Sequence, residues 1–188
     1  MNNKKFIFAY GILILSLVLI SVKFVSAQSI DAENSSVSFT IKNFGINTVK
    51  GSISDLKGEV QFQANAPENA SIDVSVAVAS LETGIKKRDE HLMKDDFFAA
   101  ETYPRIRFVS SSIQRKGNQY IAEGELSIRG VSKEVSIAFT TEDGEKLILR
   151  GKLTINRKDF KVGESTSSFT VGEEVKISIV CSLNPAGS

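Results

Sequence analysis

Apolar and polar residues alternate along most of this chain. In residues 35–42 the apolar side chains of Val37, Phe39 and Ile41 are separated by polar ones, and residues 71–81 repeat the pattern. A period of two places successive side chains on opposite faces of an extended chain, so it predicts strands with one buried and one solvated face. The sequence therefore predicts a protein built mainly of β-strands.

The same alternation returns in further segments, which are separated by short turns rich in glycine, asparagine and aspartate. These segments are residues 48–56, 59–64, 105–111, 120–128, 131–140, 146–156 and 174–183. Eight or nine antiparallel strands with tight turns predict an all-β fold, either a closed barrel or a sandwich. An eight-stranded barrel has an interior wide enough for one small ligand. Periodicity alone does not distinguish a filled core from an apolar cavity.

One long segment, residues 86–108, interrupts the strands. It contains His91, the single histidine of the chain, beside Arg88 and Asp89. Its first part is expected to form one or two helical turns. Pro104 ends the insert, because the residue before a proline is disfavoured in helical conformation. This insert is the place where the sequence concentrates its candidate chemistry.

The N-terminal residues have the pattern of an export signal. Two lysines precede an apolar run over residues 6–20, and small residues ending at Ala27 provide a cleavage site. We therefore predict a signal peptide over residues 1–27, a single domain over residues 28–188, and a location in the periplasm or outside the cell. The alternative is an uncleaved membrane anchor, because the apolar run approaches the length that spans a bilayer. After cleavage no stable membrane span is expected.

Charge and cysteine content exclude several classes of protein. Removing the three lysines of the leader leaves 20 basic against 22 acidic residues, a net charge of −2, which provides no basic footprint for nucleic acid. The single cysteine, Cys181, falls in step with the apolar residues that precede it, and we expect a buried, unreactive thiol. One cysteine and one histidine give no metal-ligand spacing, so neither a metal nor a cofactor is expected.

The insert does not contain a recognisable catalytic pattern. A catalytic histidine needs an orienting carboxylate and a nucleophile, and residues two apart on a helix do not share a face, so Asp89 is not an obvious partner of His91. We interpret Arg88, Asp89 and His91 as structural, with His91 joining the insert to the barrel by a hydrogen bond. Phe97 and Phe98 are interpreted as core anchors or as side chains that close a cavity mouth.

A second group of charged residues lies in the loop before the last predicted strand. It contains Arg157 and Asp159, two residues apart. Exposed ion pairs contribute little to stability. We therefore interpret these two residues as a pair at the surface or at the end of the barrel.

Several stretches of the sequence, taken in order, resemble the signature of a known family. They are Thr83-Gly84, Arg88-Asp89-Glu90-His91-Leu92, Asp96-Phe97-Phe98, Tyr103-Pro104 and Phe108, then residues 124–135 (GELSIRGVSKEV), residues 155–160 (INRKDF) and residues 172–177 (GEEVKI). Together they resemble the YceI-like, polyisoprenoid-binding proteins over nearly all of the mature chain. Lys161 departs from the pattern, because the family usually has glycine after the phenylalanine that corresponds to Phe160.

The resemblance implies an extended, antiparallel, eight-stranded, lipocalin-like barrel with a short helical insert. It also implies a bacterial, often periplasmic protein whose elongated apolar interior holds a long isoprenoid chain, as in a quinone or a polyprenyl phosphate, for carriage or sequestration and without catalysis. The inward-facing apolar residues predicted to line this interior are Phe39, Ile41, Val74, Val76, Phe97, Phe98, Phe108, Leu126, Ile137, Phe139, Ile155 and Ile177.

Two alternatives to this reading stay open at the level of sequence. One is a hydrolase or isoprenoid-modifying enzyme that uses His91. The other is a packed structural or stress-related barrel without a ligand. The expected partner is an isoprenoid or other long-chain lipid, and a homodimer is compatible with the sequence.

Overall fold

A computed structural model describes residues 27–185 of the chain. Within these residues it contains ten strands, which belong to one antiparallel sheet. The strands are β1 (Gln28–Ser29), β2 (Ser36–Asn43), β3 (Asn47–Ile53), β4 (Lys57–Gln61), β5 (Ser71–Ala77), β6 (Arg105–Lys116), β7 (Gln119–Ile128), β8 (Val131–Glu142), β9 (Leu147–Asn156) and β10 (Val171–Leu183). The predicted leader lies outside the described residues except for Ala27.

The sheet is curled into a half-barrel, with the strand order β1-β4-β5-β6-β7-β8-β9-β10-β2-β3. Two isolated bridges add further contacts: Ile30, just after β1, bridges Leu183 of β10, and Ser52 of β3 bridges Glu82. The all-β, antiparallel prediction is confirmed, but the prediction of eight strands is wrong. The two-residue strand β1 is too short to show any alternation, and β3 and β4 lie in different parts of the strand order although they follow each other in sequence.

Short helices fill the gaps between strands. In the part of the chain that the structure describes, they are α1 (Lys86–Leu92) and four 3₁₀ helices, η1 (Ala32–Asn34), η2 (Pro67–Asn69), η3 (Val78–Ser80) and η4 (Arg157–Phe160). The predicted strand over residues 71–81 stops at Ala77, because the hydroxyl of Ser80 donates to the Ala77 carbonyl at 2.7 Å and accepts from the Ser54 backbone N–H at 2.9 Å. A local side-chain bond of this kind competes with the sheet ladder.

An aromatic cluster is buried within the curled sheet. Phe62 packs edge-on against Tyr120 and Phe139, with ring centroids 4.9 and 5.5 Å away, and Tyr120 and Phe139 are stacked at 5.3 Å. All three side chains are buried. The Tyr120 hydroxyl donates to the Ala64 carbonyl at 3.3 Å, which satisfies the polar atom of the cluster.

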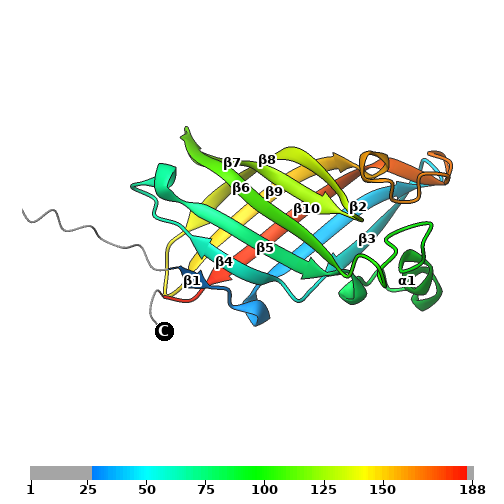
Figure 1. Ribbon diagram of the computed structural model, residues 1–188, viewed down its shortest axis with the longest axis horizontal. Coiled ribbons are helices and arrows are strands. Elements are labelled where there is room, and N and C mark those ends of the chain that lie inside the picture. The colour runs from blue at the N-terminus through cyan, green and yellow to red at the C-terminus, as the bar shows by residue number, and fades with distance from the viewer. Residues whose placement is uncertain (1–26, 186–188) are drawn as a thin grey trace, which may run out of the picture.

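The molecule is elongated, and its two ends differ (Figure 1). The strands run along the long axis of the sheet. At one end lie β1 and the C-terminal end of β10, and at the other lie α1, η4 and the turn between β2 and β3. At this second end the insert contacts the loop between η4 and β10, where the Gly163 backbone N–H donates to the Asp96 carbonyl.

Candidate functional site

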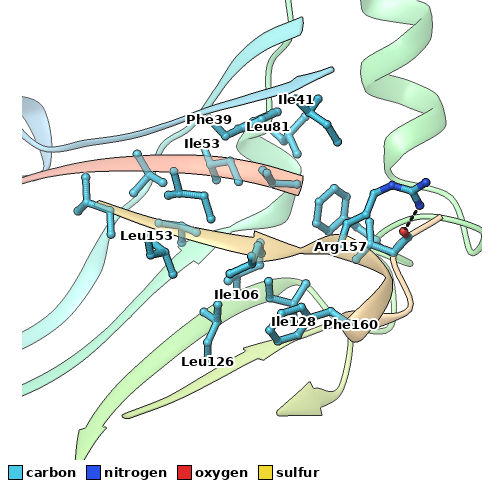
Figure 2. Close-up of a pocket in the computed structure, with 18 of the residues that line it drawn as sticks. Phe39, Ile41, Ile53, Leu81, Ile106, Leu126, Ile128, Leu153, Arg157 and Phe160 are labelled. Atoms are coloured by element: carbon cyan, nitrogen blue, oxygen red, sulfur yellow. Dashed lines mark hydrogen bonds between the residues drawn. The ribbon is translucent and has the colours of Figure 1, made fainter. Parts of the chain in front are cut away.

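The concave side of the sheet encloses a cavity of about 450 Å³. Side chains from every strand except β1 line it, so the lining follows directly from the inward face of each alternating strand. Figure 2 shows apolar side chains from several strands directed into one shared space, among them Phe39, Leu126 and Leu153. The volume falls within the range of small-molecule sites, roughly 300–1,000 Å³.

All twelve apolar residues singled out from the sequence are placed in the lining of this cavity. They are Phe39, Ile41, Val74, Val76, Phe97, Phe98, Phe108, Leu126, Ile137, Phe139, Ile155 and Ile177. Half of this set is only partly buried although it belongs to the inward face: Phe39, Ile41, Val74, Phe98, Ile155 and Ile177. Apolar side chains that face inward and yet stay partly exposed indicate that protein atoms do not fill the interior. That these side chains contact a ligand stays a prediction.

The structure adds lining residues that the sequence reasoning missed. Ile106, Ile128 and Leu153 lie two residues from Phe108, Leu126 and Ile155 in the same strands, so the period of two would have identified them. Leu81 and Phe160 also line the cavity but sit outside the strands, where no period applies. These positions depend on how the loops fold over the sheet (Figure 2).

The cavity is apolar along its length and polar at one end. Its polar lining residues, apart from Ser75 and the thiol of Cys181, are Lys42, Asn43, Thr83, Arg88, His91, Arg157, Thr166 and Thr170. They come from the end of β2, from α1 and the segment before it, from the start of η4, and from the loop that joins η4 to β10. All of these elements lie at the α1 end of the molecule, opposite the β6–β7 turn that precedes Tyr120. We call this polar end the mouth of the cavity.

Helix α1 is fixed at the mouth by a network centred on Thr83. Arg88 Nε donates to Thr83 Oγ1 at 2.6 Å, and Arg88 Nη2 donates to the Thr83 carbonyl at 2.8 Å. Asp89 Oδ1 accepts from the Thr83 backbone N–H at 3.0 Å and from its hydroxyl. A seven-residue helix is marginal on its own, so these side chains supply the stability that its length does not.

His91 forms its hydrogen bond inside the insert. Its Nε2 lies 2.8 Å from Asp96 Oδ2, and both side chains are about half exposed. The imidazole also packs edge-on against the ring of Phe97, 5.0 Å between centroids. The insert is joined to the rest of the sheet elsewhere, through the Gly163 backbone N–H, which donates to the Asp96 carbonyl at 2.9 Å, and through Arg129, whose Nη2 donates to the Asp95 carbonyl.

Arg157 is buried, and the expectation of a surface pair with Asp159 is wrong. The residue is 4% exposed, and its guanidinium donates to five backbone carbonyls. The acceptors are Val162 (2.7 Å), Gly163, Thr166 (3.1 Å), Val171 (2.8 Å) and Gly172 (2.8 Å). Removal from water lowers the pKa of the guanidinium, and an arginine side chain remains protonated in proteins. Arg157 therefore organises the loop that borders the mouth.

Cys181 lies in the cavity wall and is buried, as the alternation predicted. Desolvation raises the pKa of its thiol to about 12, which keeps it protonated and unreactive. Among residues 27–185, no three His, Cys, Asp or Glu side chains gather where they could hold a metal ion. Within that same part of the chain, no helix has the length and apolarity needed to cross a bilayer.

Comparison with known proteins agrees with this geometry. The model of the YceI-like domain matches residues 28–183. A UPF0312 protein of Photorhabdus laumondii is 31% identical over 106 residues, which cover 56% of this chain and about half, 55%, of the relative. Among solved structures, Burkholderia cenocepacia BcnA is 30% identical with a TM-score of 0.77, covering 81% of this chain and 98% of BcnA.

A second solved structure shares the fold at lower identity. It is a polyisoprenoid-binding domain from Saccharophagus degradans, 16% identical with a TM-score of 0.66, covering 85% of this chain and 98% of that domain. At this identity the similarity concerns the fold alone. The family match extends over nearly all the described residues, and it includes the insert and the η4 loop that form the mouth. The chain belongs to the YceI-like family.

Proposed function

We propose that the protein binds a long isoprenoid-type chain, such as that of a quinone or a polyprenyl phosphate, in the cavity, and that it carries or sequesters this lipid after export to the periplasm or beyond. The observation that carries the proposal is a cavity about 450 Å³ in size whose walls outside the mouth are apolar except for Ser75 and the thiol of Cys181. The choice of ligand class rests on membership of the YceI-like family, for which the sequence resemblance implies polyisoprenoid binding.

The shape and polarity of the cavity suit a lipid with one polar end. Burial of each CH₂-sized group contributes about 0.8 kcal/mol, so a chain of several isoprene units is bound firmly without any specific polar contact. The apolar chain would occupy the space between Leu126 and Leu153, and the polar group would lie at the mouth, near Arg88 and Thr170. Such binding requires neither a cofactor nor a catalytic group.

The two alternative functions, a packed barrel and an enzyme that uses His91, receive different support from the structure. A packed barrel without a ligand is disfavoured, because the inward face encloses open space rather than interdigitated side chains. An enzyme that uses His91 retains one supporting observation, the 2.8 Å contact between His91 and Asp96 at the mouth. This pair alone provides a base and an orienting carboxylate but no assigned nucleophile, so binding is the function that the site supports best.

The direct test is organic extraction of the purified protein followed by mass spectrometry. A polyprenyl or quinone species present in about one copy per chain is the expected result. A protein that is empty and also fails to take up added prenyl and fatty-acyl lipids would contradict the proposal. Export is tested separately, by N-terminal sequencing of the protein recovered from the periplasm and from the medium, where a first residue of Gln28 is expected.

A further inference from the structure

Three large apolar side chains project into solvent next to the mouth of the cavity. Phe44 is 51% exposed, Ile46 is 83% exposed and Phe169 is 69% exposed. Phe44 and Ile46 lie in the turn between β2 and β3, and Phe169 lies in the loop between η4 and β10. We call these three residues the apolar tip. A group of large apolar side chains that are more than half exposed is costly in water and often marks a surface that meets another apolar phase.

The tip is a defined structure rather than a set of scattered side chains. The rings of Phe44 and Phe169 pack edge-on with centroids 6.2 Å apart, and the Phe44 backbone N–H donates to the Thr170 carbonyl at 3.2 Å. A Cβ placed on Gly45 would lie 3.9 Å from the Phe169 ring, so this ring covers the β2–β3 turn. Two distant parts of the chain are therefore held together at the tip.

The tip is continuous with the mouth of the cavity. Asn43 and Thr170 line the cavity, and each is the immediate neighbour of a tip residue, Phe44 and Phe169 respectively. In Figure 1 the β2–β3 turn and the η4–β10 loop lie together at the end of the molecule that also carries α1. A lipid that leaves or enters through the mouth therefore passes beside exposed aromatic rings.

We propose that the apolar tip inserts into the surface of a phospholipid bilayer and so places the mouth against the membrane. The inference rests on the proposed function, because a long apolar chain can move between bilayer and cavity without crossing water only if the mouth meets the membrane. Residues 42–50 contain Lys42 and Lys50 and no acidic residue, and both lysines are exposed. Ammonium groups beside an apolar anchor suit the phosphate layer of a membrane.

The size of the tip favours a bilayer over a protein partner. A stable protein–protein interface occupies about 20 to 30 residues on each side, whereas membrane association scales with the apolar area inserted and needs only a few large side chains. Charges elsewhere at this end of the molecule are mixed: Lys158, for example, pairs with Glu173 at 3.2 Å. Binding is therefore expected to depend mainly on the apolar side chains and weakly on salt.

The absence of tryptophan from the chain allows a local test of insertion. In Phe44→Trp the new indole is the only one in the protein, and its emission is expected to shift to shorter wavelength when vesicles of phosphatidylcholine with a minor fraction of phosphatidylglycerol are added. Asn118→Trp is the matched control, because Asn118 lies in the β6–β7 turn at the opposite end of the molecule, and no shift is expected there. The emission reports only on the surroundings of position 44, so membrane binding through the apolar leader alone would not shift it.

A second pair of variants tests whether the tip carries the binding. Phe44→Ser/Phe169→Ser is expected to weaken sedimentation with the same vesicles about tenfold, while Phe44→Leu/Phe169→Leu retains most of it, because association follows inserted apolar area. A Phe44→Trp emission unaffected by vesicles, or serine variants that sediment like the unmodified protein, would overturn the proposal. So would vesicle binding lost entirely in high salt, or emission that shifts only with a protein partner.

Lipid content, measured by extraction of the same variants, separates this proposal from the proposed function. Variants that keep their lipid but do not bind vesicles identify the tip as the docking surface. If no form of the protein ever holds lipid while Phe44→Trp still inserts, the proposed function fails and membrane docking stands. If lipid is held but the unmodified protein ignores vesicles, docking fails and the proposed function stands.

Discussion

Arg157 Nε donates to the carbonyl oxygen of Gly172 at 2.8 Å, which joins the beginning of η4 to the beginning of β10. The other donors of the same guanidinium bind carbonyls between these two points, including that of Val162 at 2.7 Å. One buried cation thus binds three carbonyls of this loop and the first two carbonyls of β10. Since that loop borders the cavity mouth and ends in the apolar tip, Arg157 sets the shape of the entrance without being free to bind a ligand itself.

The first prediction concerns this cation. Arg157→Met is expected to lower the free energy of unfolding by about 3 kcal/mol, because buried carbonyls lose their donors and a methionine fills only the volume. Urea denaturation measures the loss. Arg150→Met is the control: Arg150 is an exposed residue paired with Glu142, and little change is expected. Equal stability of the two variants would show that the carbonyls around Arg157 find other donors.

The second prediction tests the cavity. On strand β9, Leu153 faces the cavity and Thr154 faces solvent. Leu153→Trp and Thr154→Trp therefore add the same side chain to opposite faces of one strand. The inward indole displaces about three CH₂-sized groups of a bound chain, which weakens lipid binding by about 2 kcal/mol or about thirtyfold. Competitive uptake of a fluorescent long-chain lipid measures the change. Unaltered binding in Leu153→Trp would place the lipid elsewhere.

The third prediction concerns the backbone at Lys161. This residue has a φ of +57° in the left-handed conformation that ends η4. Side chains with a Cβ are disfavoured there, so Lys161→Gly is expected to stabilise the protein by about 0.5–1 kcal/mol in thermal unfolding. Lys161→Ala is the control, since it removes the same side chain and keeps the Cβ. If both variants were more stable than the unmodified protein, the cause would be removal of the lysine charge and not relief of the backbone conformation.

The fourth prediction concerns pH. The hydrogen bond from Lys146 Nζ to Asp31, followed by that from Asn34, lowers the pKa of this carboxyl from 3.8 to about 2. A carboxyl whose pKa is lower in the folded state contributes stability that is complete above its ordinary pKa and is lost as protons bind. The stability difference between the unmodified protein and Asp31→Asn is therefore expected to be constant above about pH 4 and to shrink between pH 4 and 2.

The partner of Asp31 provides the control for the pH experiment. Lys146→Met removes the main cause of the lowered pKa, so this variant should lose most of the pH dependence that Asp31→Asn also loses. Combining both substitutions should then cost less than the sum of the two, because they remove one shared interaction. Additive effects would show that the two side chains act independently.

Sequence reasoning located the strands and the inward apolar faces because alternation is a local property. Val74 and Ile155, for example, were recognised from their own neighbours, and both line the cavity. What failed depended on contacts between distant segments. The sequence predicts a pair of Arg157 and Asp159 at the surface or at the end of the barrel, because the backbone carbonyls that Arg157 binds cannot be identified from residue types. The apolar tip depends on Phe44 and Phe169, which are 125 positions apart in the chain and meet only in the fold.

The last prediction separates binding from catalysis at the mouth. His91 and Asp96 are about half exposed and bonded to each other at 2.8 Å. In His91→Gln the amide N–H can still donate to Asp96, so the insert should keep its structure and lipid uptake should change less than about twofold. The control is Asp96→Asn, which removes the charge while keeping an acceptor. Incubation of bound lipid with each variant, followed by mass spectrometry, checks for conversion. A product that forms with the unmodified protein and disappears in His91→Gln, while binding is retained, would establish an enzyme; identical lipid in all three proteins is the result expected of a carrier.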